Sequence, residues 1–182
     1  GNNENDFNDL KINENKIGNK IFSAVQASNY MSISQDNVFY MSLMRNIENN
    51  KLLINPKKFL LFLEKFIFKY FAICHLPANK VERLFSKYAI ELEKKCNVNL
   101  NKENITKSNI KQNTDRLFKE FESELRNLTK SIRENFIDKF QEIKYGSSQK
   151  NRKLITYILS KYENHLQGSS EFLINYQIIN IE

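Results

Sequence analysis

The sequence predicts a mostly α fold, a helical bundle of about six helices in two packed groups, with one marginal C-terminal β-strand. Three observations support this expectation. Apolar residues recur at three- and four-residue spacing along most of the chain, which is the pattern of helices with one buried face. Glycine and proline together supply only six of 182 residues, whereas an all-β chain needs turn residues every few positions. Hydrophobic residues make up 41% and charged residues 27%, a composition typical of globular proteins.

The strongest apolar pattern spans residues 55–96 and predicts two helices joined at a proline corner. Asn55 is placed to cap the first helix, and Pro56 fits a first turn, where a missing N–H is tolerated. Pro77 cannot continue that helix, so we expect the chain to turn there and begin a second one. The first helix is apolar on most sides, which predicts a position in the centre of the bundle.

Composition along the chain divides it into four expected segments. Residues 1–35 form a polar lead-in, and residues 36–96 form a first helical subdomain. Residues 97–112 are polar, Asn-rich and without period, as expected of a connection between subdomains. Residues 113–182 form a second helical subdomain, which ends in the expected strand.

Capping residues predict where several helices begin. Either Ser34 or Asp36 can cap the first helix of the first subdomain. Either Asn113 or Thr114 can cap the first helix of the second subdomain. Two further starts are predicted, one at Ser131 (a capping box with Glu134) and one at Ser148.

The second subdomain carries two further apolar patterns. The helix expected after Ser131 has a stripe that we predict to be buried. The β-branched and aromatic run over residues 171–182 alternates in the manner of a strand. A single strand is not stable alone, so a pairing partner is expected elsewhere. The stripe consists of Phe136, Ile137, Phe140 and Ile143.

Net charge is +7 and is distributed unevenly. Residues 1–50 hold four Lys or Arg against six Asp or Glu, a balance of −2, which leaves +9 on residues 51–182. A basic body suits a nucleic-acid partner, because neutralising phosphates releases counterions. A solvated Lys-rich surface explains the same charge and is the interpretation that the composition favours. The candidate nucleic-acid contacts are Lys80, Arg83 and Lys87 on one helix face, and Lys150, Arg152 and Lys153 at a helix start.

Catalytic and metal-binding patterns are not predicted. Cys74 and His75 are adjacent on a helix and therefore point about 100° apart, so they do not form a nucleophile–base pair. Cys74 and Cys96 are expected to be free thiols. Two distant His and two distant Cys do not make a metal site, and no Gly-rich phosphate loop occurs, so no cofactor is expected.

The chain is expected to be cytoplasmic and without membrane contact. Its polar, acidic first residues do not resemble a signal peptide. The longest apolar run is too short to span a bilayer and is interrupted by Glu64, Lys65 and Lys69.

Three stretches carry a resemblance to a known family. They are DNVFYMSLM, FLEKFIFKYFAICHLPANKVERLFSKYAIEL and FIDKFQEIKYGSSQKNRKLITYILSKYENHL, with Leu-Pro-x-Asn-Lys and Arg-Lys…Tyr-Ile-Leu as markers. Over roughly residues 36–182 the chain resembles the helical middle region of GmrSD-type proteins, which are modification-dependent (type IV) restriction endonucleases. The later stretch is similar to the segment that leads into their C-terminal HNH-type nuclease domain.

The resemblance carries no catalytic residue onto this chain. The family's Asp-Gly-Gln-Gln-Arg-like motif does not occur here, nor does the nuclease His-Ile-x-Pro-like motif that would follow Glu182. The resemblance therefore implies a non-catalytic helical scaffold that positions an NTP-using module against an HNH-type nuclease. It also implies that the chain is a fragment of a longer defence protein. The partners of the fragment would then be DNA and the flanking domains of that longer protein.

Two other functions fit the residues. One is a stand-alone helical module that binds protein partners through aromatic surface. The other is an independent basic bundle that binds nucleic acid. Salt dependence separates them, because phosphate contacts weaken steeply with salt and aromatic docking does not.

Overall fold

The computed structural model describes residues 24–31, 33–48, 55–96, 107–130, 132–146 and 148–166. The expectation of a mostly α fold is confirmed, and the described residues are mostly helical, with no strand among them. Residues 24–30 are helical. The later elements are α2 (Asn37–Glu48), α3 (Lys57–Ile67), the π-helix η1 (Phe68–Ile73), α4 (Asn79–Cys96), α5 (Lys107–Thr129), α6 (Ile132–Gln141) and α7 (Gln149–Leu166).

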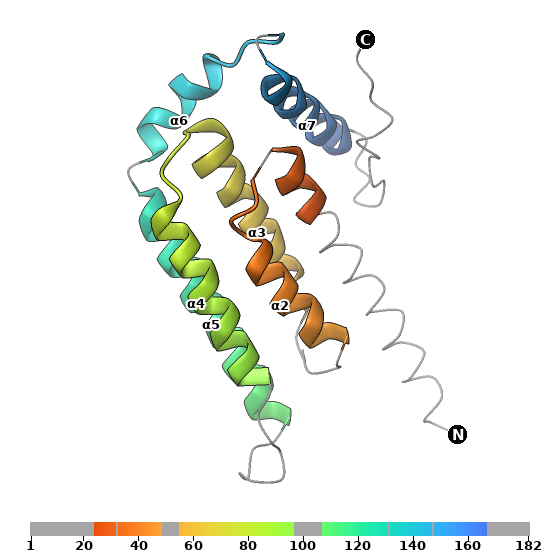
Figure 1. Cartoon of the computed structure of the whole chain (residues 1–182), viewed down its shortest axis with the longest axis vertical. Helices are drawn as coiled ribbons and strands as arrows, with labels where there is room; N and C mark the ends of the chain where they lie inside the picture. Colours follow the sequence, from red (N-terminus) through yellow and green to blue (C-terminus); the bar gives the residue numbers. More distant parts are fainter. Residues whose placement is uncertain are drawn as a thin grey trace, which may run out of the picture.

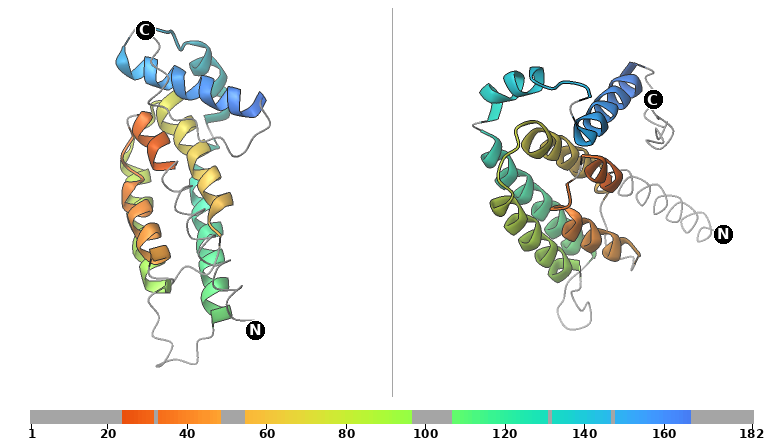
Figure 2. Two further views of the ribbon diagram at one scale, coloured as in Figure 1. Left: turned by 90° about the vertical axis from the view of Figure 1, so that its right-hand side faces the viewer. Right: turned by 45° about the horizontal axis from the view of Figure 1, so that its top comes forward.

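Helices α2, α3, α4 and α5 form the body of the molecule in two layers (Figure 1). The side view in Figure 2 shows α2 and α4 in one layer and α3 and α5 in the other. Helices α6 and α7 lie across one end of this four-helix body. That end also holds the corner between η1 and α4, and the turn between α5 and α6.

The proline-marked corner is confirmed. The Asn55 side-chain oxygen accepts a hydrogen bond from the Lys57 amide at 2.9 Å, as expected of a cap. The helix runs as α3 and then widens into the π-helical turn η1, and the chain turns after Cys74. The Tyr70 hydroxyl donates to the Pro77 carbonyl oxygen at 3.0 Å and fixes the corner.

Aromatic rings from four helices meet in the core. Phe121 of α5 is fully buried, and its ring centroid lies 5.2 Å from that of Phe39 on α2. It also lies 5.4 Å from the rings of Phe59 and Phe85 and 4.2 Å from the ring of Tyr88. These contacts join both expected helical groups into one hydrophobic core.

Helices α2 and α4 are also joined by polar contacts. The Ser42 hydroxyl lies 3.1 Å from the Ala89 carbonyl oxygen and 3.2 Å from a Glu93 carboxylate oxygen. Arg45 donates to the same Glu93 oxygen at 3.1 Å. A small side chain at position 42 therefore lets the two helices approach closely while its hydroxyl is hydrogen bonded.

The expected start of α5 was wrong. The helix begins at Lys107, inside the segment expected to be a connection, and neither Asn113 nor Thr114 caps it. Thr114 is fully buried within the helix, and its hydroxyl donates to the Ile110 carbonyl oxygen at 2.8 Å. Ile110 is buried one turn earlier, so the apolar face extends further toward the N-terminus than the polar sequence indicated.

The last third of the expected lead-in, residues 24–35, takes part in the fold. Residues 24–35 are described in part and contribute to the core through Ala24, Ala27, Met31 and Ile33. Ala24, Ala27 and Met31 recur at helical spacing, but alanines bury little apolar area and gave a weak periodic signal.

The expected apolar stripe of α6 is only partly correct. Phe136 packs edge-on against Phe68 of η1, with ring centroids 6.3 Å apart. Ile137 is 60% exposed and Phe140 38% exposed, because α6 contacts the body of the molecule along a narrow face. Ser131 and the Glu134 side chain lie outside the described residues, as does the expected strand at 171–182.

The start of α7 is confirmed. The Asn151 amide donates to the Ser148 hydroxyl oxygen at 3.1 Å, and the Arg152 amide donates to the Ser148 carbonyl oxygen at 3.0 Å. Gly146 precedes this cap with a φ of 89°, a conformation that favours glycine.

Candidate nucleic-acid interface and buried polar cluster

The predicted basic residues come from two elements that begin near the same end of the bundle. Lys80, Arg83 and Lys87 lie on the first half of α4 and are exposed. At the start of α7, Lys150 and Arg152 are exposed and Lys153 is half-buried. Figure 1 shows that α4 and α7 both begin beside the end that α6 crosses.

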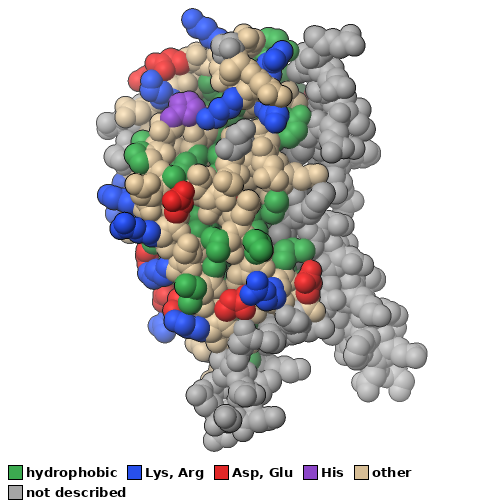
Figure 3. All heavy atoms as spheres, viewed as in Figure 1, with side chains coloured by type: hydrophobic (Ala, Val, Ile, Leu, Met, Phe, Trp, Pro, Cys, Tyr) green, Lys and Arg blue, Asp and Glu red, His purple; other side chains and the backbone are tan. Residues whose placement is uncertain are grey.

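Most of the net charge lies at this end. Residues 74–87 and 130–153 contain ten Lys or Arg and four Asp or Glu, a balance of +6 of the chain's +7. Lys130 and Lys144 are exposed there as well. Figure 3 shows Lys and Arg side chains over this end and along the edge formed by α4 and α5. We refer to the exposed residues Lys80, Arg83, Lys130, Lys144, Lys150 and Arg152 as the basic end.

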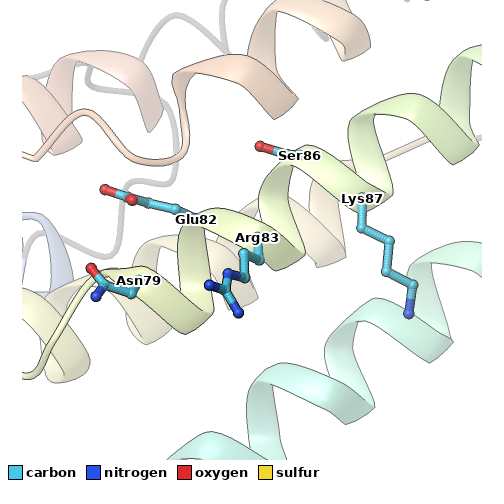
Figure 4. A pocket seen from close by; sticks show the side chains of 5 residues that line it. All are labelled: Asn79, Glu82, Arg83, Ser86 and Lys87. Carbon is cyan, nitrogen blue, oxygen red and sulfur yellow. The ribbon is translucent and has the colours of Figure 1, made fainter.

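A shallow groove of about 500 Å³ lies on α4 within this surface. It is lined by Asn79, Glu82, Arg83, Ser86 and Lys87. Figure 4 shows the Arg83 guanidinium extended away from the helix axis, whereas the Lys87 side chain runs toward α5. Arg83 offers planar donors that suit phosphate oxygens.

Lys87 differs from the other predicted contacts because it is already paired. Its Nζ lies 2.7 Å from Glu124 Oε1 on α5. The Tyr88 hydroxyl donates to the same oxygen, also at 2.7 Å. Sequence reasoning did not find Glu124, because the pairing joins residues 37 positions apart.

Cys74 and His75 lie at the corner that follows η1. His75 adopts a φ of 50°, and its Nδ1 lies 3.1 Å from the Phe71 carbonyl oxygen. Burial raises the pKa of the Cys74 thiol, and the nearby Lys139 charge opposes this rise. A raised thiol pKa disfavours the thiolate that a nucleophile requires. Cys74 and Cys96 are free thiols, as expected.

A buried polar cluster lies at the N-terminal end of α2. Asp36 is fully buried, and its Oδ2 accepts a hydrogen bond from the Ser28 hydroxyl at 2.6 Å. Tyr40 is one turn further along α2, also buried, and burial together with the charges of Asp36 and Glu64 raises its pKa. Glu64 of α3 in turn accepts a hydrogen bond from the Tyr157 hydroxyl of α7 at 2.7 Å.

The Asp36 carboxyl gives the stability of the protein a pH dependence. Burial raises its pKa above the ordinary value of 3.8, although the hydrogen bond from Ser28 opposes this rise. The folded state therefore binds more protons than the unfolded chain. The resulting stabilisation is complete below the unfolded pKa and is lost as pH rises through the folded pKa.

We expect Asp36→Asn to be more stable than the wild type at neutral pH. Asparagine is neutral at all pH values and keeps an oxygen that can accept the Ser28 hydrogen bond. The free-energy difference between variant and wild type should widen between about pH 3 and about pH 7, measured by urea unfolding at each pH. A difference that stays constant or narrows with rising pH would refute this assignment.

Within the described residues, no group of three or more His, Cys, Asp or Glu side chains is placed to hold a metal ion. Among the described helices, none has the length and apolar character needed to cross a membrane. Comparison with family models, curated proteins and solved structures finds no significant match to this chain.

Proposed function

We propose that this chain is a helical scaffold that binds DNA through its basic end and performs no catalysis of its own. The observation that carries the proposal is the charge balance of +6 on residues 74–87 and 130–153. These residues lie at one end of the bundle, where α6 crosses it (Figure 1). Clustered Lys and Arg side chains bind the phosphate backbone mainly by releasing counterions, without reading base sequence.

A rigid core supports this role. The rings around Phe121 join α2, α3, α4 and α5, so Lys80 and Arg83 project from a helix that is packed into this core. Arg83 on α4 and Arg152 on α7 lie on different helices, and both are exposed. A duplex that contacts both would be held in one orientation.

The resemblance to GmrSD-type restriction endonucleases makes duplex DNA the polyanion of first choice. On this proposal the scaffold would place an NTP-using module and an HNH-type nuclease with respect to the bound DNA.

Neutralising two arginines should weaken DNA binding and its dependence on salt. We expect the Arg83→Gln/Arg152→Gln double variant to reduce the slope of log K against log salt by about 1.8, because each lost phosphate contact removes about 0.9. The measurement is fluorescence anisotropy with a short labelled duplex over a series of salt concentrations.

The matched control is Lys57→Gln/Lys58→Gln. These two exposed lysines begin α3, at the end of that helix away from α6, and their neutralisation changes net charge by the same amount. The control should retain a slope near that of the wild type. Equal losses in both double variants would show that net charge, and not the basic end, determines binding.

A second candidate function is a protein-interaction module. Leu159, Tyr162 and Leu166 follow one face of α7 and are 52%, 61% and 61% exposed. Such a stripe suits docking of an apolar partner. Binding through it should change little with salt, whereas DNA binding through the basic end should weaken steeply.

A further inference from the structure

The groove on α4 contains a lysine that is held by a carboxylate from the neighbouring helix. Lys87 lines the groove beside Arg83, yet its Nζ is 2.7 Å from Glu124 Oε1 of α5. Figure 4 shows the side chain of Lys87 directed toward α5, away from Arg83. The positive charge of Lys87, which the sequence analysis counted among the candidate phosphate contacts, is therefore neutralised by Glu124 in the free protein.

Glu124 is fixed where it holds Lys87. Its Oε1 accepts hydrogen bonds from Lys87 and from the Tyr88 hydroxyl, both at 2.7 Å, and these contacts lower the pKa of its carboxyl. Lys87 Nζ also lies 4.8 Å from the centroid of the Tyr88 ring. Tyr88 thus anchors the carboxylate, and the carboxylate anchors the lysine.

The pair is nevertheless open to an incoming anion. The Lys87 side chain is 52% exposed and the Glu124 side chain 39% exposed. A phosphate that approaches Arg83 can reach Lys87 only by displacing Glu124 or by accepting its repulsion. Replacing the Glu124 carboxylate by a phosphate beside the exposed Lys87 ammonium changes the free energy of the system little.

We propose that Glu124 is a built-in competitor of DNA phosphates, which keeps Lys87 out of the interface and thereby limits the affinity of the α4 surface. This inference rests on the proposed function, since it assigns a regulator to the same surface. Any change that neutralises or moves Glu124 releases Lys87 as an additional phosphate contact.

The test is Glu124→Gln, measured with the same duplex and salt series. Glutamine keeps a side-chain oxygen that can accept the Tyr88 hydrogen bond, but it cannot neutralise a lysine. We expect the affinity for DNA to rise about fivefold and the salt slope to steepen by about 0.9, the value of one added phosphate contact. Circular dichroism during thermal unfolding checks that the fold is retained.

The matched control is Glu122→Gln. Glu122 lies on the same helix and pairs with Arg126 of that helix, so its removal makes the same change in net charge without releasing Lys87. We expect a smaller gain in affinity for this variant and no steeper slope. In a Lys87→Gln/Glu124→Gln double variant the extra gain should disappear. Lys87→Gln alone should bind more weakly than the wild type, because it leaves the Glu124 charge without its lysine.

The outcomes separate this inference from the proposed function. Failure of the wild-type protein to bind duplex DNA at low salt would refute both. DNA binding by the wild type, with Glu124→Gln no tighter than Glu122→Gln, would refute the role of Glu124 alone. A full gain that persists in the Lys87→Gln/Glu124→Gln variant would likewise overturn it, because the gain would not come from Lys87.

Discussion

Replacing Phe121 with alanine is expected to lower the free energy of unfolding by about 3 to 5 kcal/mol. The side chain is fully buried and contacts rings from α2, α3 and α4. The loss combines the transfer free energy of the ring with the cavity that remains, because four helices cannot all move inward to fill it. Equilibrium unfolding in urea or guanidinium measures the change.

The control for this prediction is Ile137→Ala on α6. Ile137 is 60% exposed, so its truncation removes little buried area and should cost under about 0.5 kcal/mol. If Phe121→Ala were no more destabilising than this surface substitution, the ring cluster would not be the centre of the core.

Replacing Glu64 with alanine is expected to lower the free energy of unfolding by about 2 kcal/mol. Glu64 Oε1 on α3 accepts a hydrogen bond from the Tyr157 hydroxyl at 2.7 Å and forms an ion pair with the Lys161 ammonium at 2.5 Å. Its side chain is only 13% exposed, so truncation removes a largely buried carboxylate together with its hydrogen bond from the Tyr157 hydroxyl. Lys161 is more exposed and can be solvated again, which limits the loss.

Two measurements test whether Glu64→Ala acts mainly by loosening α7. Urea unfolding gives the free energy, and hydrogen exchange shows whether α7 opens more often while α4 and α5 do not. Tyr157→Phe, which removes only one hydroxyl, should cost about 1 kcal/mol. Glu64→Ala with wild-type stability and unchanged exchange in α7 would contradict the view that this carboxylate holds α7 to the body.

The helical character and most helix positions could be predicted because they depend on local patterns. The cap at Asn55, the turn at Pro77 and the cap at Ser148 each follow from the preferences of single residues, and all three are confirmed. The start of α5 was missed because Thr114 is polar by type, yet it is buried through a hydrogen bond to its own helix. Tertiary burial, which local propensity does not describe, decides such positions.

The basic residues of the candidate site could be predicted from the sequence, but their ion-pair and hydrogen-bond partners could not. Lysines and arginines are visible in the sequence, so Arg83 and Arg152 were identified as candidate contacts. The partners of Lys87 and Tyr157 are 37 and 93 residues away along the chain, and no spacing rule indicates them. The helix packing that brings Glu124 to Lys87 therefore supplies an ion pair that the sequence alone did not reveal for this candidate contact.

Lysine footprinting of the protein with and without duplex DNA tests the central claim most directly. Acetylation of exposed amines, read by mass spectrometry, reports which lysines the DNA covers. We predict that Lys80 and Lys150 lose reactivity on DNA binding, while Lys57 and Lys58 at the start of α3 keep theirs. Protection of Lys57 and Lys58 with no protection of Lys80 and Lys150 would contradict the assignment of the basic end as the DNA-binding surface.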